Sequence, residues 1–409
     1  MVLFLHNRYR TTGGEERVVE DLLWLVRERL GEHAELLAHD SAAIPRTRAA
    51  LGLLRGGLAP QEVAAAVARA GAGVVHAHNL HPSFGWRSLA AARRAGAAVV
   101  LHLHQYRLVC AVGVCFTDGH ECTRCHGRNT LPGVALNCRG SLPEAAAYAF
   151  ALARWQRRMV SLADVVLVPS VFARERLAEL GAGLRPERVR VLAPPLRPRA
   201  EPPGAVEGRG AGPGGMGAPA QTGAGAGAQG GLPQRYALVV SRLAAEKGID
   251  VAIGACRRAG IALVVAGEGP ERGRLEALAR GAEVRWLGAV DDERLAGLRA
   301  GASVALVPSL SAETFGVVAA EAMAAGVPVL GSRVGALPEI LAEEELVDPG
   351  DEQELARAIE RRAGDRAAAE RGRERIASIC GPEVVAGGLR DAYGQAREHA
   401  AAAGRSRAA

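Results

Sequence analysis

The feature that most constrains the fold of this chain is a regular alternation between two kinds of segment. Short runs rich in Val, Leu and Ala end in small or polar residues, and longer Ala/Leu/Arg/Glu segments with helical periodicity separate them. The short runs are nearly continuously apolar, which indicates strands buried on both faces and therefore a parallel sheet with helices on each side. The expected strands are 2–7, 34–40, 73–79, 98–105, 164–170, 188–194, 236–242, 262–267, 284–290, 303–309 and 327–332.

The length of the chain predicts more than one domain. Its 409 residues suffice for two or three domains of about 100–200 residues each. The segments DVVLVPS (164–170) and SVALVPS (303–309) are alike, which indicates the same kind of sheet in each half. We expect an α/β protein with two doubly wound, Rossmann-like domains. The expected boundaries are 1–198 for the first domain, 199–234 for a flexible Gly/Ala/Pro-rich linker, 235–381 for the second domain and 382–409 for a C-terminal helix and frayed tail.

Composition argues against several other classes of protein. Hydrophobic residues make up 49% and charged residues 23%, which is typical of a globular chain, and no apolar run approaches the ~20 residues that span a bilayer. The first apolar run is too short for a secretory signal, so we expect a cytoplasmic protein. A net charge of +6 without a dense basic segment argues against a nucleic-acid partner. The run RWQRR at 154–158 fits either a solvated helix face or weak peripheral contact with an anionic membrane.

The basic residues are distributed very unevenly between the two types. Of 50 basic residues, 49 are arginines and one is a lysine, Lys247, which is either a chance survivor or a place where a compact ammonium group is needed. Lys247 and Arg242 follow the expected strand 236–242 and precede a helix expected to begin near Ile249. Because the carboxyl end of a parallel strand beside a helix N-terminus favours an anion, this position predicts phosphate binding.

The segment 309–326 (SLSAETFGVVAAEAMAAG) contains two carboxylates eight residues apart, Glu313 and Glu321. Glu313 lies in the expected turn after the strand 303–309, and Glu321 lies in an apolar helix that Phe315 and Gly316 open. A buried carboxylate among apolar neighbours needs a hydrogen-bonding partner; a solvated helix face is the alternative. The pair could accept hydrogen bonds from two separated hydroxyl groups, with backbone N–H groups of Phe315 and Gly316 offered to an anion between them.

The first half contains weaker signals. The first expected strand leads to Gly13 and Gly14, a pair that would let the backbone approach a bulky ligand closely. The dinucleotide fingerprint G-x-G-x-x-G is incomplete here, which argues against a nicotinamide or flavin enzyme. In the strand 98–105, alternation places His102 and His104 on one face, with His104 nearer the ligand-facing end. For each histidine, a hydrogen-bonded structural role is an equal alternative.

Five of the seven cysteines gather in one segment, 110–138. A C-x2-C pair with further thiols nearby is typical of a closed zinc site of four thiolates. Reduced thiols without metal are the next interpretation, and disulfides fit a cytoplasmic protein poorly. Such a zinc ion would pin a long loop without taking part in a reaction. The simplest ligand set is Cys110, Cys122, Cys125 and Cys138, with Cys115, His120 and His126 as substitutes.

Together these segments resemble the retaining GT-B glycosyltransferases, specifically glycosyltransferase family 4. Glu313 and Glu321 match the E-x7-E signature of the family, residues 241–248 match its S-R-L-x-x-E-K-G loop, and residues 267–270 match G-E-G-P. The resemblance covers almost the whole chain apart from the Gly-rich insert and the tail. It implies two Rossmann-like domains facing each other across a cleft, the first binding a hydroxyl-bearing acceptor and the second a nucleoside diphosphate sugar.

The resemblance also implies a role for each matching residue. Arg242 and Lys247 would hold the donor diphosphate, Glu313 the sugar hydroxyls and Glu321 the nucleotide ribose. His104 would lie against the donor sugar near the reacting carbon. The implied catalytic residues are His104, Glu313, Lys247 and Arg242, and the implied donor-binding residues are Gly13, Gly14, Arg242, Lys247, Gly267, Glu268, Leu287, Glu313, Phe315, Gly316, Val317 and Glu321.

The implied reaction requires no cofactor. Basic side chains and helix N-termini can stabilise the departing diphosphate, and no D-x-D metal motif stands in a suitable loop. A UDP sugar is the favoured donor, and the acceptor is a hydroxyl of a glycan, a lipid-linked glycan or a secondary metabolite. The alternatives are a nonhydrolysing sugar-nucleotide epimerase and a non-catalytic module that binds a sugar nucleotide or a glycan. The oligomeric state is open.

Overall fold

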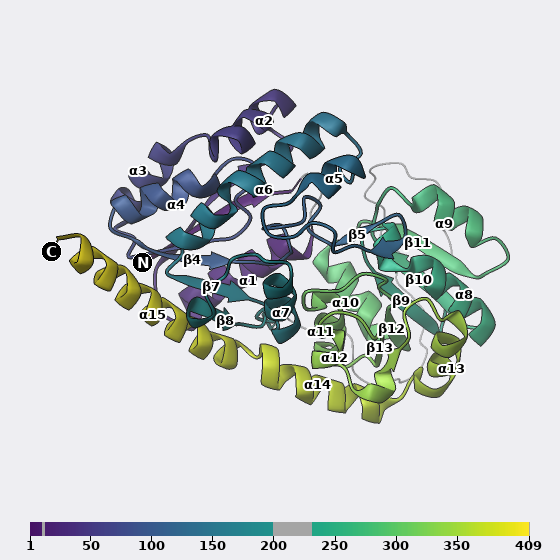
Figure 1. Ribbon diagram of the computed structural model, residues 1–409. Coiled ribbons are helices and arrows are strands. Elements are labelled where there is room, and N and C mark those ends of the chain that lie inside the picture. The colour runs from purple at the N-terminus through teal and green to yellow at the C-terminus, as the bar shows by residue number, and fades with distance from the viewer. Residues whose placement is uncertain (10–12, 199–230, 409) are drawn as a thin grey trace, which may run out of the picture.

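A computed structural model describes residues 1–9, 13–198 and 231–408 of the protein. It contains two six-stranded parallel sheets with helices on both faces of each, which confirms the expected pair of doubly wound α/β domains (Figure 1). The first sheet consists of β1 (Val2–Arg8), β2 (Ala34–Asp40), β3 (Val74–Ala77), β4 (Ala98–His102), β7 (Val165–Val168) and β8 (Val189–Val191). The second consists of β9 (Tyr236–Val240), β10 (Ala262–Ala266), β11 (Val284–Gly288), β12 (Val304–Val307), β13 (Val329–Ser332) and β14 (Leu346–Val347).

In the first domain the strand order is β2-β1-β3-β4-β7-β8. Side chains alternate along β1, so that Leu3 and Leu5 belong to one core layer and Val2 and Phe4 to the other. The first layer packs on α3 (Pro60–Ala70), α4 (Gly85–Arg94), α6 (Leu142–Leu162) and α7 (Val171–Glu179). The second layer packs on α1 (Gly14–Glu28) and α15 (Pro382–Ala408). Helix α2 (Arg46–Arg55) lies against α6.

In the second domain the strand order is β11-β10-β9-β12-β13-β14, so the order reverses between β9 and β12. Ligands of open α/β sheets bind beyond the carboxyl ends of the strands at such a switch point. One face is covered by α8 (Ile249–Ala259), α9 (Arg272–Leu278) and α13 (Glu352–Arg362). The other is covered by α10 (Asp292–Gly301), α11 (Val317–Ala324), α12 (Leu337–Ile340) and α14 (Arg366–Cys380).

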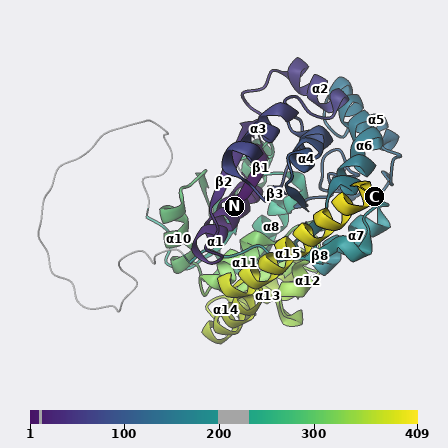
Figure 2. The ribbon, with the colours of Figure 1, turned by 90° about the vertical axis from the view of Figure 1, so that its left-hand side faces the viewer.

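The last helix returns from the second domain to the first. α15 follows α14 and runs along the first domain (Figures 1 and 2). Its residues Val385, Leu389 and Tyr393 are buried in the core layer that contains Val2 and Phe4. α15 therefore completes the core of the first domain, although it follows the second in the sequence.

Loops at the carboxyl ends of the two sheets contact each other. The Thr314 hydroxyl, after β12, donates a hydrogen bond to the backbone oxygen of His104, after β4, at 2.9 Å. The Ser170 hydroxyl, after β7, donates to the backbone oxygen of Thr314 at 2.7 Å. At the first turn of α7, the backbone N–H of Phe172 donates to the Glu339 carboxylate at 2.6 Å. The ligand-facing edges of the two sheets are therefore opposed.

Between β4 and β7 the chain forms a cysteine-rich insertion. It contains a short antiparallel hairpin of β5 (Phe116–Thr117) and β6 (His120–Glu121), followed by α5 (Leu131–Ala135). The hairpin turn contains Asp118 with φ 51° and Gly119 with φ 79°, left-handed values that suit an Asp-Gly pair. The insertion is attached to the first domain through α5, which packs on α6.

Several strands end earlier than the sequence pattern predicts. β4 ends at His102, so His104 lies in the loop that follows, and β9 ends at Val240, before Arg242. Polar residues at the end of a strand do not show where its backbone hydrogen bonding to the neighbouring strand stops, because the same residue types also occur in the loop that follows. The two-residue strand β14 was not expected, since Leu346–Val347 is too short to show a period. Residues 199–230, most of the expected linker, lie outside the described residues.

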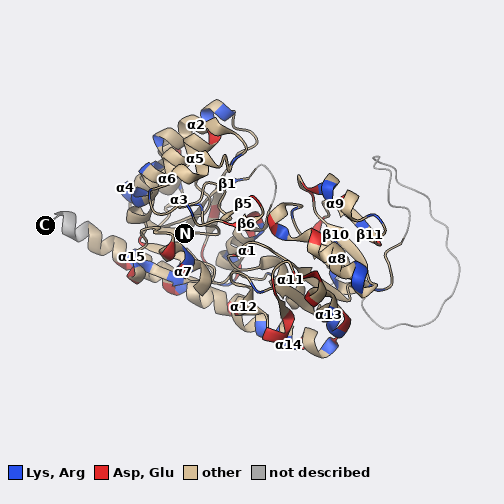
Figure 3. Cartoon of the chain, turned by 45° about the vertical axis from the view of Figure 1, so that its right-hand side comes forward, with Lys and Arg blue, Asp and Glu red and all other residues tan. Residues whose placement is uncertain are grey.

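Charge and hydropathy add little to this description. Figure 3 shows acidic and basic residues mixed along α13 and α14. Within the described part of the chain, no helix has the length and apolar character needed to span a membrane.

Candidate functional site

The lone lysine and the first carboxylate of the E-x7-E pair meet at the switch point. Lys247 ends the short 3-10 turn Ala245–Lys247 after β9, and Glu313 lies in the loop after β12. The Lys247 ammonium donates a hydrogen bond to Glu313 Oε1 at 2.6 Å, and the Ser309 hydroxyl donates to the same oxygen at 2.6 Å. Two loops that are 66 positions apart in the sequence therefore form one polar cluster.

The charge state of Glu313 follows from these contacts. Burial raises the pKa of this carboxyl, whereas the Lys247 charge and the hydrogen bonds from Lys247 and Ser309 lower it; the result is a pKa below the usual value of 4.5. Glu313 is therefore an ionised hydrogen-bond acceptor at neutral pH. It suits the binding of hydroxyl groups.

The Glu313 turn depends on a glycine from a different loop. Gly335 has φ +60°, and a Cβ at this position would lie 2.3 Å from the Glu313 backbone oxygen and 2.4 Å from its nitrogen. The N–H of Ala336 donates to that same backbone oxygen at 2.9 Å. Gly335 therefore positions Glu313, and sequence reasoning missed it because a single glycine in a loop has no distinguishing pattern.

The second carboxylate, Glu321 on α11, is held by two arginines. Arg17 of α1 donates to Glu321 Oε1 at 2.9 Å, and Arg299 of α10 donates to its other oxygen. Arg17 also pairs with Asp292 at the start of α10. Because Arg17 belongs to the first domain, Glu321 takes part in a bridge between the domains. Neither arginine stood out in a sequence with 49 of them.

Arg242 does not share the carboxylate of Lys247. Its guanidinium pairs with Glu246, four residues later in the same loop, and the Arg242 side chain is half exposed. The structure therefore places the two cations in one loop, but each against its own carboxylate.

The remaining second-domain residues of the expected site lie on α11 and on the neighbouring strands and loops. Phe315 is buried, and Gly316 caps α11 with φ +96°; a Cβ there would lie 2.5 Å from Leu337. Val317 contacts the cores of both domains. The other three expected contacts are the loop residues Gly267 and Glu268 after β10 and Leu287 in β11.

The first domain contributes His104 to the same region. Its backbone oxygen accepts the Thr314 hydroxyl, next to Glu313, and its Nε2 lies 2.8 Å from His78 Nδ1. Burial lowers the pKa of His104, and Glu15 and Glu16 oppose this effect only in part. His104 is therefore a neutral imidazole at the boundary between the domains.

The glycine pair lies at the start of α1. The Gly13 N–H donates to Glu16 Oε2 at 2.8 Å, and the Tyr9 N–H donates to the other oxygen of Glu16 at 3.0 Å. Gly14 begins α1, and a Cβ on it would meet no atom within 4 Å. Residues 10–12, between β1 and this glycine pair, lie outside the described residues.

The five cysteines of the insertion line a single small cavity of about 20 Å³. A hydrogen bond from the Cys115 thiol lowers the pKa of Cys110 to about 6, and burial raises the pKa of Cys125 to about 11. Across the described ranges, one group of three or more His, Cys, Asp or Glu has its ligand atoms within 4.8 Å of one another, and its members are histidines. The five thiols of the insertion therefore line one cavity, but no three of them have their sulfur atoms within 4.8 Å of one another.

Two family models match the chain. The model of the group 1 glycosyl transferases matches residues 229–377, and the model of the glycosyl transferase 4-like domain matches residues 2–195.

Curated relatives match over shorter stretches. The GDP-mannose-dependent alpha-(1-6)-phosphatidylinositol dimannoside mannosyltransferase of Mycobacterium tuberculosis is 45% identical over 100 residues, which cover 24% of this chain and 26% of the relative. The glycogen synthase of M. tuberculosis is 36% identical over 172 residues, which cover 38% of this chain and 41% of the relative. The chain therefore matches less than half the length of either relative.

Solved structures match over nearly the full chain. Sucrose-phosphate synthase from Thermosynechococcus elongatus superposes with a TM-score of 0.63 at 19% identity, covering 97% of this chain and 99% of the other. Anabaena Alr3699/HepE in complex with UDP and glucose superposes with a TM-score of 0.59 at 17% identity, covering 95% and 98%. Likeness at such low identity is evidence of a shared fold.

The fold and the site now define a class. Two opposed Rossmann-like domains, with the first carboxylate of an E-x7-E pair beside a lysine at the switch point of the second, are those of a GT-B protein. The chain belongs to the group 1 glycosyltransferases of the family 4 type, because the two family models match both of its domains.

Proposed function

We propose that this protein transfers a sugar from a nucleoside diphosphate sugar to a hydroxyl group of an acceptor, with retention of the anomeric configuration. The observation that carries the proposal is the contact between Lys247 and Glu313 across the switch point of the second domain. A cation and an ionised acceptor side by side match the two parts of such a donor, its diphosphate and its sugar hydroxyls. The first domain, 1–198, would bind the acceptor.

The proposed mechanism relies on electrostatic stabilisation by the protein. Lys247 and Arg242 bind the diphosphate as negative charge develops on it, assisted by N–H groups at the start of α11. Glu313 orients the sugar, and Glu321 binds the ribose after exchanging its contact with Arg17. The acceptor hydroxyl attacks the face from which the diphosphate departs and transfers its proton to the leaving phosphate. No divalent cation is required in this scheme.

The donor nucleotide is the next part of the proposal. We favour a UDP sugar, in line with the Anabaena neighbour that binds UDP and glucose, while GDP-mannose is the donor in the name of a M. tuberculosis relative. The identity of the donor nucleotide can be tested by measuring the thermal unfolding temperature of the full chain with UDP, GDP, ADP and their nucleotide sugars. A ligand at 100 times its Kd stabilises the folded state by about 2.7 kcal/mol, and we expect the largest shift with uridine nucleotides.

The reaction itself is tested by a nuclear magnetic resonance time course with the best-binding donor, with and without an acceptor panel. Release of nucleoside diphosphate together with a new glycosidic signal of unchanged anomeric configuration is the expected result. Conversion of the donor to its epimer without acceptor would show a sugar-nucleotide epimerase instead. Donor binding with no turnover across the whole panel would show a binding module.

We also propose a structural zinc ion in the cysteine insertion, held by Cys110, Cys122, Cys125 and Cys138. Its support is the C-x2-C spacing and the convergence of these thiols, with Cys115, on one cavity. Zinc binding would draw the sulfur atoms together and fix the hairpin against α5. Loss of zinc in a Cys122→Ser/Cys125→Ser variant, with the donor-induced thermal shift retained, is the expected result; a zinc-free parent protein would refute the site.

A further inference from the structure

Five of the protein's 11 histidines lie together inside the first domain. His76 and His78 stand two residues apart on and just after β3, and His102 ends the neighbouring strand β4. His6 and His104 flank them, within ring-contact distance of His78. These imidazoles lie on the sheet face that α15 covers, because the alternating residues Val74 and Val100 belong to that core layer.

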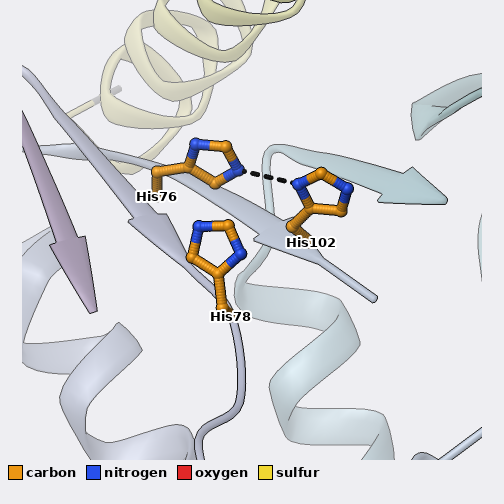
Figure 4. A group of neighbouring side chains, drawn as sticks. All are labelled: His76, His78 and His102. Carbon is orange, nitrogen blue, oxygen red and sulfur yellow. Dashed lines mark hydrogen bonds between the residues drawn. The ribbon is translucent and has the colours of Figure 1, made fainter. Parts of the chain in front are cut away.

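Three of these histidines, His76, His78 and His102, present nitrogen atoms to one another (Figure 4). One ring nitrogen from each lies within 4.8 Å of the others. His76 Nε2 and His102 Nδ1 form a hydrogen bond of 3.2 Å, and a metal ion between them would replace the shared proton, which would move to the other nitrogen of the same ring. In a tetrahedral zinc site with Zn–N bonds of about 2.0–2.1 Å, two ligand nitrogens lie about 3.3–3.4 Å apart, so this pair already has nearly the spacing of a ligand edge.

The protonation states suit metal binding. Burial lowers the pKa of His76 to about 3 and places the pKa values of His78 and His102 well below the usual 6.5. The three rings are therefore neutral at physiological pH, the form in which imidazole binds metal ions. No carboxylate is needed, since three neutral histidines form a known type of zinc site.

One of these nitrogens has no hydrogen-bond partner. His78 Nε2 is fully buried and makes no hydrogen bond to any described residue. Leaving a buried polar atom without a partner costs about 1–3 kcal/mol. The other nitrogen of His78 is already used, because Nδ1 lies 2.8 Å from His104 Nε2. Nε2 is therefore the ring nitrogen of His78 that is available to bind a metal ion.

We propose that His76, His78 and His102 bind one divalent transition-metal ion, with zinc the best-fitting ion. The proposed ligands are His76 Nε2, His78 Nε2 and His102 Nδ1, and a tetrahedral shell would be completed by a fourth, small ligand such as water. The Tyr393 hydroxyl of α15 lies 2.8 Å from His76 Nδ1 and orients that ring from behind, as outer partners of metal-bound histidines do. The site is separate from the cysteine insertion.

Such an ion would set the tautomer of His104. With the ion on Nε2, His78 must carry its proton on Nδ1 and donate it to His104 Nε2. His104 then carries its own proton on Nδ1. The ion therefore acts as a structural element behind the candidate site and takes no part in sugar transfer.

The experiment counts metal in a protein that lacks the C-x2-C pair. The full chain with Cys122→Ser/Cys125→Ser is stripped with a chelator and titrated with Co²⁺ alone. We expect one tightly bound Co²⁺ per chain, with visible d–d absorption and no thiolate-to-cobalt charge-transfer band. His78→Gln in this background should weaken Co²⁺ binding at least tenfold, whereas His33→Gln, at an exposed histidine outside the cluster, should leave it unchanged.

A second variant is needed because His78→Gln changes a buried residue and could weaken metal binding simply by disturbing the fold. Tyr393→Phe keeps all three ligands and removes only the partner of His76, and it should weaken Co²⁺ binding by about 10- to 100-fold. The proposal is overturned if the background protein binds no Co²⁺, if its only bound Co²⁺ shows a thiolate band, or if both His78→Gln and Tyr393→Phe bind Co²⁺ as tightly as the background. None of these outcomes depends on sugar transfer.

Discussion

Each charged side chain of the candidate donor site is paired with another one from the protein. Lys247 contacts Glu313, Arg242 pairs with Glu246, and Glu321 is held by arginines. When a ligand binds, its phosphates and hydroxyls must therefore replace the present partners of these side chains. Until then, the ion pairs hold the charged side chains of the site in place. Substituting different members of these pairs should therefore have different effects on donor binding.

Lys247→Ala should lower kcat/KM at least tenfold, which corresponds to about 1.4 kcal/mol of transition-state stabilisation. The reason is the loss of the point charge next to the departing phosphate. Steady-state kinetics with the donor found in the thermal-shift panel provides the measurement. Lys247→Arg is the matched control, because it retains the positive charge, and its kcat/KM should lie between that of the parent and that of Lys247→Ala. A kcat/KM close to that of the parent for Lys247→Ala would contradict the proposed role of Lys247 in phosphate binding.

The lowered pKa of Glu313 predicts a pH dependence of stability. The folded state binds this proton less readily than the unfolded state, so the carboxylate contributes stability above its ordinary value of 4.5 and loses it as the pH falls through the lowered value. The free energy of unfolding of the parent should therefore fall more steeply between about pH 5 and about pH 3 than that of Glu313→Gln. Glu20→Gln, an exposed position on α1, should follow the parent. Parallel curves for the parent and Glu313→Gln would contradict the assignment.

At the scale of elements, the sequence predicts strands far better than it predicts what their loops contact. Apolar runs located all eleven expected strands, because burial on both faces leaves a continuous hydrophobic signal. Lys247, Glu313 and Glu321 were found through their spacing and strand ends. Arg17 and Gly335 were missed, because their roles depend on which elements the fold brings together and neither residue carries a pattern of its own.

Helices α1 and α11 belong to different domains, and the Arg17–Glu321 pair joins them. If the ribose competes with Arg17 for Glu321, then Arg17→Met should lower the KM for the donor by up to about fivefold, the equivalent of an ion pair worth up to about 1 kcal/mol. The gain should shrink at high salt, which screens the pair. Arg29→Met, at the other end of α1, is the control. An increased KM in Arg17→Met would show instead that Arg17 binds the donor directly.

At the scale of the whole molecule, α15 ties the stability of the first domain to the far end of the described chain. Leu389 is fully buried in the first-domain core, whereas Val384 on the same helix is 53% exposed. Leu389→Ala should lower the free energy of unfolding by about 2–5 kcal/mol because it leaves a cavity. Val384→Ala should change it by less than about 0.5 kcal/mol. Denaturant unfolding followed by circular dichroism measures both, and equal effects would contradict the packing of α15.

The return of α15 also sets an order of events during synthesis. The first sheet leaves the ribosome early, and α1 covers part of the face lined by Val2 and Phe4, but the part that packs on α15 stays exposed until Leu389 and Tyr393 emerge. Roughly 200 residues are synthesised between the end of the first sheet and α15. At about 5–20 residues per second, this apolar surface therefore stays exposed for about 10–40 s. We therefore expect the nascent first domain to expose apolar surface for longer than the second, whose core is complete once α14 is made.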